Sequence, residues 1–195
     1  EKSVKNSIKS YIKSSIDNYS ELLDDDDFQN SIERIVKKSI EAFKLDKKIL
    51  LCGNGGSAAD AQHIAAELSG KFYIDRPPLY AEALHVNSSY ITAVANDYGY
   101  EETYSRMVEA SGRKGDILIG ISTSGDSLNV INALKKGKEI EMLTIGFTGN
   151  NGGGMNSICD IIIKVPSVET PRIQEAHILI GHIICQLIEK EMFAK

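Results

Sequence analysis

Two stretches decide the fold: Ile49-Leu50-Leu51-Cys52-Gly53-Asn54-Gly55-Gly56-Ser57 and Ile117-Leu118-Ile119-Gly120-Ile121-Ser122-Thr123-Ser124-Gly125-Asp126-Ser127. In each, a short apolar run is followed by glycine- and serine-rich residues and then by a helical pattern, near 58–69 and 128–138. Continuous apolar strands that alternate with helices are typical of a mostly parallel sheet covered on both faces. Three further apolar runs, at 79–86, 142–147 and 161–165, bring the predicted sheet to five strands.

Helical patterns precede and follow this α/β region. Residues 1–45 predict two helices, because apolar residues recur there every three to four positions. The acidic run Asp24–Asp27 separates them and is expected to cap the second helix. The last segment, 172–193, is apolar on most faces, which predicts a helix buried in the protein or in a subunit interface. We therefore divide the chain into N-terminal helices at 1–45, packed on the core or on partner subunits, and one α/β unit at 46–195.

Composition excludes several classes of function. The 195-residue chain has a net charge of −5, so it lacks the basic surface that nucleic-acid binding needs. Its three cysteines, Cys52, Cys159 and Cys185, are widely spaced and form no CxxC pair, which argues against a disulfide framework and favours a reducing cytoplasm. No apolar run approaches the roughly 18 residues of a spanning helix, and the N-terminus lacks an apolar signal core. We expect neither export nor membrane anchoring.

The two loops that follow the first and third predicted strands should share one edge of the sheet. Gly53–Ser57 can bring backbone amides to an anion, but its spacing fits neither the dinucleotide fingerprint nor the P-loop, and such turns are often only turns. Ser122–Ser127 is more specific, because four hydroxyls within six residues can donate hydrogen bonds to phosphate oxygens. One of these hydroxyls is expected to cap the following helix. Together the loops indicate a phosphorylated small molecule.

Polar residues on two predicted helices are candidates for acid–base or metal chemistry. His63 and Glu67, four residues apart, share one helix face and could bind a metal or substrate, or form a surface ion pair. In the last helix, His182 could transfer protons near neutral pH, the alternative being a hydrogen-bonded core histidine. Spacing alone leaves open whether Gln174 or Glu175 faces the same cavity as His182. The polar residues that interrupt the last helix are Gln174, Glu175, His177 and His182.

Four motifs resemble those of bacterial phosphoheptose isomerases: CGNGGSAADAQHIAAEL at 52–68, ANDYGYEETYSR at 95–106, GDILIGISTSGDSLNV at 115–130 and TPRIQEAHILIGHI at 170–183. They stand in the family's order and spacing and cover nearly the whole chain. The resemblance implies a flavodoxin-like SIS domain and a homotetramer with active sites at subunit interfaces. It also implies conversion of sedoheptulose 7-phosphate to D-glycero-D-manno-heptose 7-phosphate through an enediol or enediolate, towards the heptose of lipopolysaccharide or capsule.

Carried over by position, the resemblance also implies roles for single residues. Glu67 is expected to be the base that moves the carbon proton, and His182 its acid/base partner at the sugar oxygens. One zinc ion per subunit is expected on His63, Glu67, Gln174 and His182, so the resemblance selects Gln174 over Glu175. The phosphate loop is expected to use Ser122, Thr123, Ser124 and Ser127. The sugar is expected to contact Asn54, Gly55, Gly56, Ser57, Glu67, Asp97 and Gln174.

The sequence departs from the family at two positions. Lys71 stands where some members have Arg, which replaces a planar two-pronged contact by a point charge. Pro171 stands where some relatives carry an acidic residue, and we leave it out of the site.

Two other functions remain open. One is a non-catalytic SIS module, either a sugar-phosphate sensor or an adaptor that binds the replication initiator; the presence of Glu67, Gln174 and His182 favours the enzyme. The other is a sugar-phosphate lyase or an isomerase for another ketose phosphate, which would differ in the carbon that faces Glu67.

Overall fold

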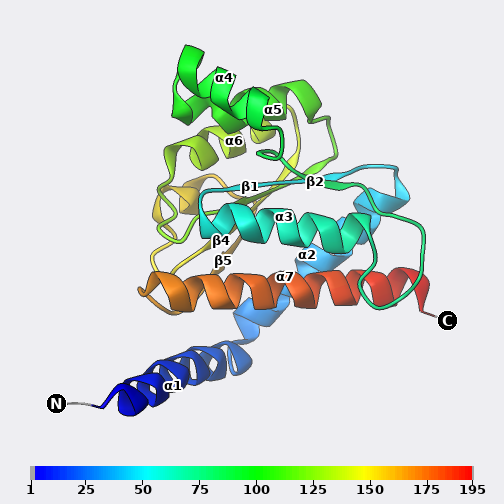
Figure 1. Cartoon of the computed structure of the whole chain (residues 1–195). Coiled ribbons are helices and arrows are strands. Elements are labelled where there is room, and N and C mark those ends of the chain that lie inside the picture. The colour runs from blue at the N-terminus through cyan, green and yellow to red at the C-terminus, as the bar shows by residue number, and fades with distance from the viewer. Residues whose placement is uncertain (1–2, 195) are drawn as a thin grey trace.

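The computed structural model describes residues 3–194 and has three layers, with helices on both faces of a five-stranded sheet (Figure 1). All neighbouring strands pair parallel, in the order β2-β1-β3-β4-β5. This is the flavodoxin-like order, whose ligand-binding crevice lies at the carboxyl ends of β1 and β3. The predicted fold class is confirmed. Residues 1, 2 and 195, which the sequence analysis included in its segments, lie outside the described residues. The strands are β1 (Ile49–Gly53), β2 (Ala81–Ala83), β3 (Ile117–Ile121), β4 (Leu143–Thr148) and β5 (Ile161–Lys164).

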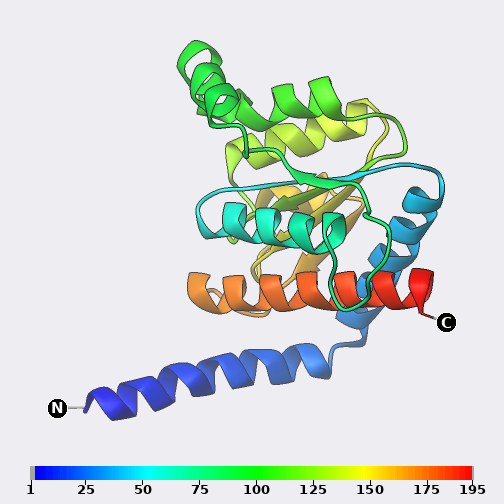
Figure 2. The same cartoon turned by 45° about the vertical axis from the view of Figure 1, so that its right-hand side comes forward.

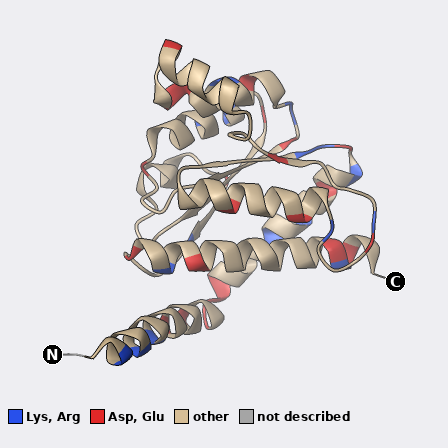
Figure 3. Cartoon of the chain, in the orientation of Figure 1, with Lys and Arg blue, Asp and Glu red and all other residues tan. Residues whose placement is uncertain are grey.

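The central strands β1 and β3 contribute to two hydrophobic cores, because successive side chains of a strand point to opposite faces. In β1, Ile49 and Leu51 pack with the helices of one face, whereas Leu50 and Cys52 pack with those of the other. The central strands β1, β3 and β4 carry no charged residue; the charges lie on the helices and loops around them (Figure 3). One face is covered by α2 (Asp26–Lys44), α3 (Gly56–Ser69) and α7 (Thr170–Phe193), the other by α4 (Ser88–Tyr98), α5 (Thr103–Ser111) and α6 (Leu128–Glu139).

The N-terminal helix α1 (Val4–Leu23) extends away from the sheet and contacts α7 (Figure 2). The acidic run after it ends one helix and begins the next, as predicted: the Asp25 carboxylate accepts a hydrogen bond of 3.0 Å from the Phe28 amide at the start of α2. The apolar stripe along α1 is more than half exposed within this chain, at Val4, Ile8, Tyr11, Ile12 and Ile16.

The helix α7 is buried along much of its length against α3, α2 and α1, which confirms the prediction of a buried last helix. By contrast, the sequence patterns did not predict α4, α5 or the short 3-10 turns η1 (Tyr100–Glu102) and η2 (Gly153–Ser157). The helix α4 buries Val94 and leaves most other side chains accessible, so it carries little apolar periodicity. Within residues 3–194, every helix is too short or too polar to span a bilayer.

Candidate active site

Two asparagines join the loops that follow β1 and β3. The Asn54 amide nitrogen donates to Asn129 Oδ1, and the Asn129 nitrogen donates back to Asn54 Oδ1, both at 2.9 Å. The Tyr100 hydroxyl donates to the same Asn54 oxygen at 3.0 Å. The predicted meeting of the two loops at one sheet edge is therefore present. Sequence reasoning missed Asn129 and Tyr100, although a polar residue just inside a helix that packs on a buried strand is a signal for such a contact.

The hydroxyls of the serine loop converge on one another. Ser122 Oγ lies 2.9 Å from Ser127 Oγ and 3.3 Å from Ser124 Oγ, and it accepts a hydrogen bond of 3.2 Å from the Gly125 amide. Ser127 occupies the N-cap position of α6 but makes no side-chain capping bond. The prediction that one of these hydroxyls caps the helix is therefore wrong, because the Ser127 hydroxyl bonds with Ser122 within the loop. Converging hydroxyls at a helix N-terminus suit a phosphate group.

The segment after β4 forms hydrogen bonds with the serine loop. The Gly149 amide donates to the Thr123 carbonyl at 3.0 Å, and the Gly154 amide donates to Asp126 Oδ1 at 2.8 Å. Gly125 has a φ of +72°, and a Cβ there would overlap the Gly152 carbonyl. Only glycine fits this position, and it allows the serine loop to lie against this segment, where the two hydrogen bonds hold it.

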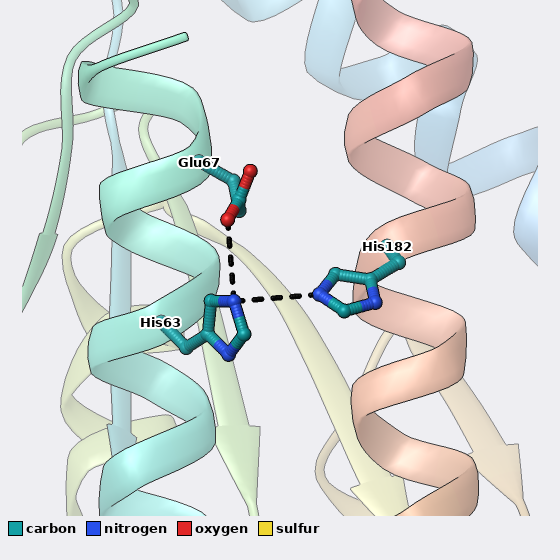
Figure 4. Close-up of side chains that lie close together, drawn as sticks. All are labelled: His63, Glu67 and His182. Atoms are coloured by element: carbon teal, nitrogen blue, oxygen red, sulfur yellow. Dashed lines mark hydrogen bonds and ion pairs between the residues drawn. The ribbon is translucent and has the colours of Figure 1, made fainter. Parts of the chain in front are cut away.

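A second polar cluster lies between α3 and α7 and consists of His63, Glu67 and His182 (Figure 4). His63 Nε2 is 3.2 Å from Glu67 Oε1 and 3.4 Å from His182 Nε2. The two imidazole rings meet edge to face, with centroids 5.0 Å apart. His63 and Glu67 share one face of α3, as their spacing predicts. His182 is half-buried rather than enclosed in the core, so it can reach a ligand.

This cluster fits a metal ion by its donor chemistry. One ligand atom from each of its three residues lies within 4.8 Å of the other two. Two imidazole nitrogens and one carboxylate oxygen form the protein donor set of many catalytic zinc sites, which leave a further position open for substrate.

The structure distinguishes Gln174 from Glu175. Gln174 points at the loop after β1: a Cβ built on Gly56 would lie 2.5 Å from Gln174 Nε2. Glu175 instead accepts a hydrogen bond of 2.7 Å from Ser15 of α1 and pairs with Arg172. Gln174 precedes His182 by eight residues, about 12 Å of helix rise, so in this conformation it lies with the loops and not with the His63 cluster.

The remaining predicted residues lie on α3, on the serine loop and on α4, and Lys71 lies just beyond α3. Gly55, with a φ of +55°, is the N-cap residue of α3, and Ser57 is buried in its first turn. Thr123 is half-buried in the serine loop. Asp97 is exposed in the last turn of α4, where it accepts a hydrogen bond of 2.9 Å from Asn96. Lys71 is exposed just after α3.

Two further titratable groups flank the site, and sequence reasoning assigned a role to neither. Asp60 lies one turn before His63; burial raises the pKa of its carboxyl to about 6, although the nearby His63 lowers it. His177 is the hydrogen-bonded core histidine of α7, with Nε2 3.0 Å from the Thr148 carbonyl oxygen, and burial lowers its pKa to about 4.

Comparison with known proteins identifies the family. The sequence model of the SIS domain matches residues 10–149. The chain is 54% identical over 192 residues to a phosphoheptose isomerase of Clostridium acetobutylicum, covering 98% of both chains. The chain belongs to the phosphoheptose isomerase family. Two solved structures of this family, from Neisseria gonorrhoeae and Francisella tularensis, match with TM-scores of 0.91 and 0.93 at 39% and 37% identity. The matches cover 96% of this chain and 100% and 99% of theirs, which confirms the family and fold inferred from the sequence motifs.

Proposed function

We propose that the protein is an aldose–ketose isomerase that converts sedoheptulose 7-phosphate to D-glycero-D-manno-heptose 7-phosphate. The proposal rests on two polar groups at neighbouring places in the fold. Converging hydroxyls lie at the N-terminus of α6, which the hydrogen bonds between Asn54 and Asn129 join to the loop before α3, and they suit a phosphate. His63 and Glu67 lie about two and three turns into α3, beside His182 of α7, and suit proton transfer. The relatives named phosphoheptose isomerase point to a seven-carbon sugar phosphate as the substrate.

In this proposal, Glu67 takes a proton from C1 of the ketose, its carboxyl group exchanges that proton with solvent, and it then delivers a proton to C2. His182 gives a proton to the C2 carbonyl oxygen, which yields the enediol, and then takes the proton of the C1 hydroxyl as the aldehyde forms. One proton leaves C1 and one is added at C2, while one is added at the C2 oxygen and one leaves the C1 oxygen, so the reaction balances without an oxidant. The contact between the His182 and His63 rings orients His182 for this exchange.

His63, Glu67 and His182 would hold a zinc ion, which when bound stabilises the negative charge that develops on the sugar oxygens. One carboxylate oxygen of Glu67 can face the ion while the other moves the carbon proton. The contact of Gln174 with Gly56 favours substrate binding for Gln174; as a fourth metal ligand it would have to turn away from that loop.

The substrate would be held at both ends. Ser122, Thr123, Ser124 and Ser127 bind the phosphate in this proposal, and Asn54, Gly55, Gly56, Ser57 and Asp97 contact the sugar. The hydrogen bonds from Asn129 and Tyr100 fix the orientation of Asn54 before substrate arrives, which lowers the entropic cost of binding.

The proposal extends to a homotetramer with active sites at subunit interfaces. Two apolar surfaces support assembly: the exposed stripe of α1 and a groove between α1, α2 and α7. The side chain of His63 is 48% exposed, which leaves room for a partner beside the cluster. Free thiols at all three cysteines suit the cytoplasm, where heptose for lipopolysaccharide or capsule would be made. The groove is lined by Tyr19, Leu22, Leu23, Phe28, Gln29, Ile32, Glu33, Val36, Lys37, Ile40, Leu179, Ile183, Leu187 and Glu191.

The test is turnover by the purified protein. We expect sedoheptulose 7-phosphate to yield an aldoheptose 7-phosphate, activity to fall after treatment with a chelator, and activity to return with zinc. Binding of the sugar phosphate without turnover under any of these conditions would instead support the sensor or adaptor function.

A further inference from the structure

A buried carboxylate of α7 holds the chain that follows α3. Glu189 is 2% exposed and accepts hydrogen bonds from three successive backbone amides, those of Phe72, Tyr73 and Ile74, at 3.0, 2.6 and 2.7 Å. Its fourth donor is Arg76 Nε at 3.0 Å. Both carboxylate oxygens are therefore engaged, and the backbone of 72–74 is fixed to the last turns of α7.

The partner of Glu189 also closes the C-terminal end of α3. The Arg76 guanidinium donates to the carbonyl oxygens of Glu67 at 2.9 Å, Leu68 at 2.7 Å and Gly70 at 3.0 Å. Carbonyls in the last turn of a helix have no partner within the helix, and Arg76 supplies a donor to that of Glu67. The Leu68 carbonyl also accepts a hydrogen bond of 3.1 Å from the Leu79 amide. The Arg76 side chain is only 2% exposed, so these hydrogen bonds are shielded from water.

Arg76 and Glu189 hold the backbone next to two residues of the polar cluster, Glu67 and His182. Glu67 belongs to the turn whose carbonyl Arg76 holds. Phe72 belongs to the backbone segment that Glu189 holds, and the centroid of its ring lies 5.8 Å from that of His182. The His63 ring centroid lies 5.0 Å from that of His182. His182 is thus in contact with two other rings, one of which depends on the ion pair for its place.

We propose that Arg76 and Glu189 are a positioning pair that sets the relative placement of Glu67 and His182. The pair touches neither substrate nor metal, and the inference rests on the proposed isomerase function for its kinetic readout. A buried ion pair adds little net stability over well-packed apolar residues. The contribution of this pair is to fix geometry, because buried charged donors and acceptors form strong hydrogen bonds in only a few arrangements.

The protein contains a matched control between the starts of β1 and β3. Asp116, 1% exposed, precedes β3 and accepts hydrogen bonds from the backbone amides of Lys48 and Arg113 at 3.1 and 2.8 Å. It also pairs with the Lys48 ammonium at 2.6 Å. Asp116→Asn therefore removes the same kind of interaction as Glu189→Gln, but its partners, Lys48 and Arg113, belong to neither α3 nor α7.

The experiment measures kcat, KM, zinc affinity and urea stability for wild type, Glu189→Gln, Arg76→Lys and Asp116→Asn. We expect both site variants to lose roughly 10- to 100-fold in kcat and in zinc affinity, as is typical when a group that orients catalytic or metal-binding residues is removed. KM should change little, because the serine loop is untouched. Asp116→Asn should lose stability but keep kcat and zinc affinity. Arg76→Lys keeps the charge without the planar fork and serves if Glu189→Gln does not fold.

Folded site variants with wild-type kcat and zinc affinity would overturn the inference. An equal loss of kcat in Asp116→Asn would also overturn it, because the effect would then follow general destabilisation. A wild-type protein without turnover would refute the proposed function instead. In that case the zinc affinities still decide the inference, with unchanged affinity in both site variants counting against it.

Discussion

Gly56→Ala is expected to damage the site without damaging the fold. Gly56 is the first residue of α3 and has a backbone conformation open to any residue, so alanine introduces no strain there. Its new methyl group would lie 2.5 Å from Gln174 Nε2, and the amide must move by about 0.9 Å to reach the 3.4 Å of ordinary contact. Alanine in place of glycine stabilises a helix by up to about 1 kcal/mol.

The expected loss in kcat/KM follows from this displacement of the Gln174 amide. A misplacement of about 1 Å in a group that positions substrate can cost on the order of 10²-fold in rate. We therefore expect kcat/KM to fall by roughly 10- to 100-fold, or about 1.4 to 2.7 kcal/mol of transition-state stabilisation. The free energy of unfolding in urea should be unchanged or slightly higher.

The added methyl group could also block the ligand directly, and a double-mutant cycle separates the two effects. Gly56→Ala, Gln174→Ala and the double variant are compared by steady-state kinetics with sedoheptulose 7-phosphate. If the effect passes through Gln174, adding Gly56→Ala to Gln174→Ala costs nothing further. Undiminished activity in Gly56→Ala, or an equal loss whether or not Gln174 is present, would show that Gly56 does not act through the position of Gln174.

Three further predictions concern single side chains. Glu67→Gln should lower kcat by roughly 10² to 10⁴-fold with folding and sugar-phosphate binding retained, and near-normal turnover would remove Glu67 from the role of base. Ser124→Ala should raise KM by roughly tenfold or more, the worth of one hydrogen bond to a charged group, with kcat little changed; an unchanged KM would contradict the phosphate assignment. His177, whose pKa is lowered from 6.5 to about 4, should bind a proton more readily when unfolded, so its contribution to stability is complete above pH 6.5 and is lost as pH falls towards 4. Between pH 7 and 5, wild type should therefore lose about 2 kcal/mol more unfolding free energy than His177→Gln, as measured by urea titration; equal losses would show that His177 is not responsible.

Much of the fold follows from local patterns in the sequence. Apolar runs such as Ile117–Ile121 are buried on both faces, so they identify strands without knowledge of their neighbours. The serine loop was also recognisable, because its hydroxyls lie close in sequence. By contrast, α4 buries Val94 and otherwise offers little apolar periodicity, and the pattern therefore gave no signal for it.

Contacts between distant residues could not be predicted in this way. Asn54 and Asn129 are 75 residues apart, and Phe72 and Glu189 are 117 apart, so their hydrogen bonds arise only when the sheet brings β1, β3 and α7 together. The orientation of Gln174 rather than Glu175 towards the loops depends on where α7 meets α3 and α1. Helical spacing alone leaves this choice open, since the two residues are adjacent in sequence.

Isomerisation by proton transfer leaves a label on the product when the reaction runs in deuterated water, and NMR detects that label. Purified protein is incubated with sedoheptulose 7-phosphate, with zinc or with chelator. We predict an aldoheptose 7-phosphate that carries solvent deuterium at C2, formed more slowly in the presence of chelator. A ketose phosphate that stays unchanged in every condition, while still binding to the protein, would contradict isomerisation by this protein.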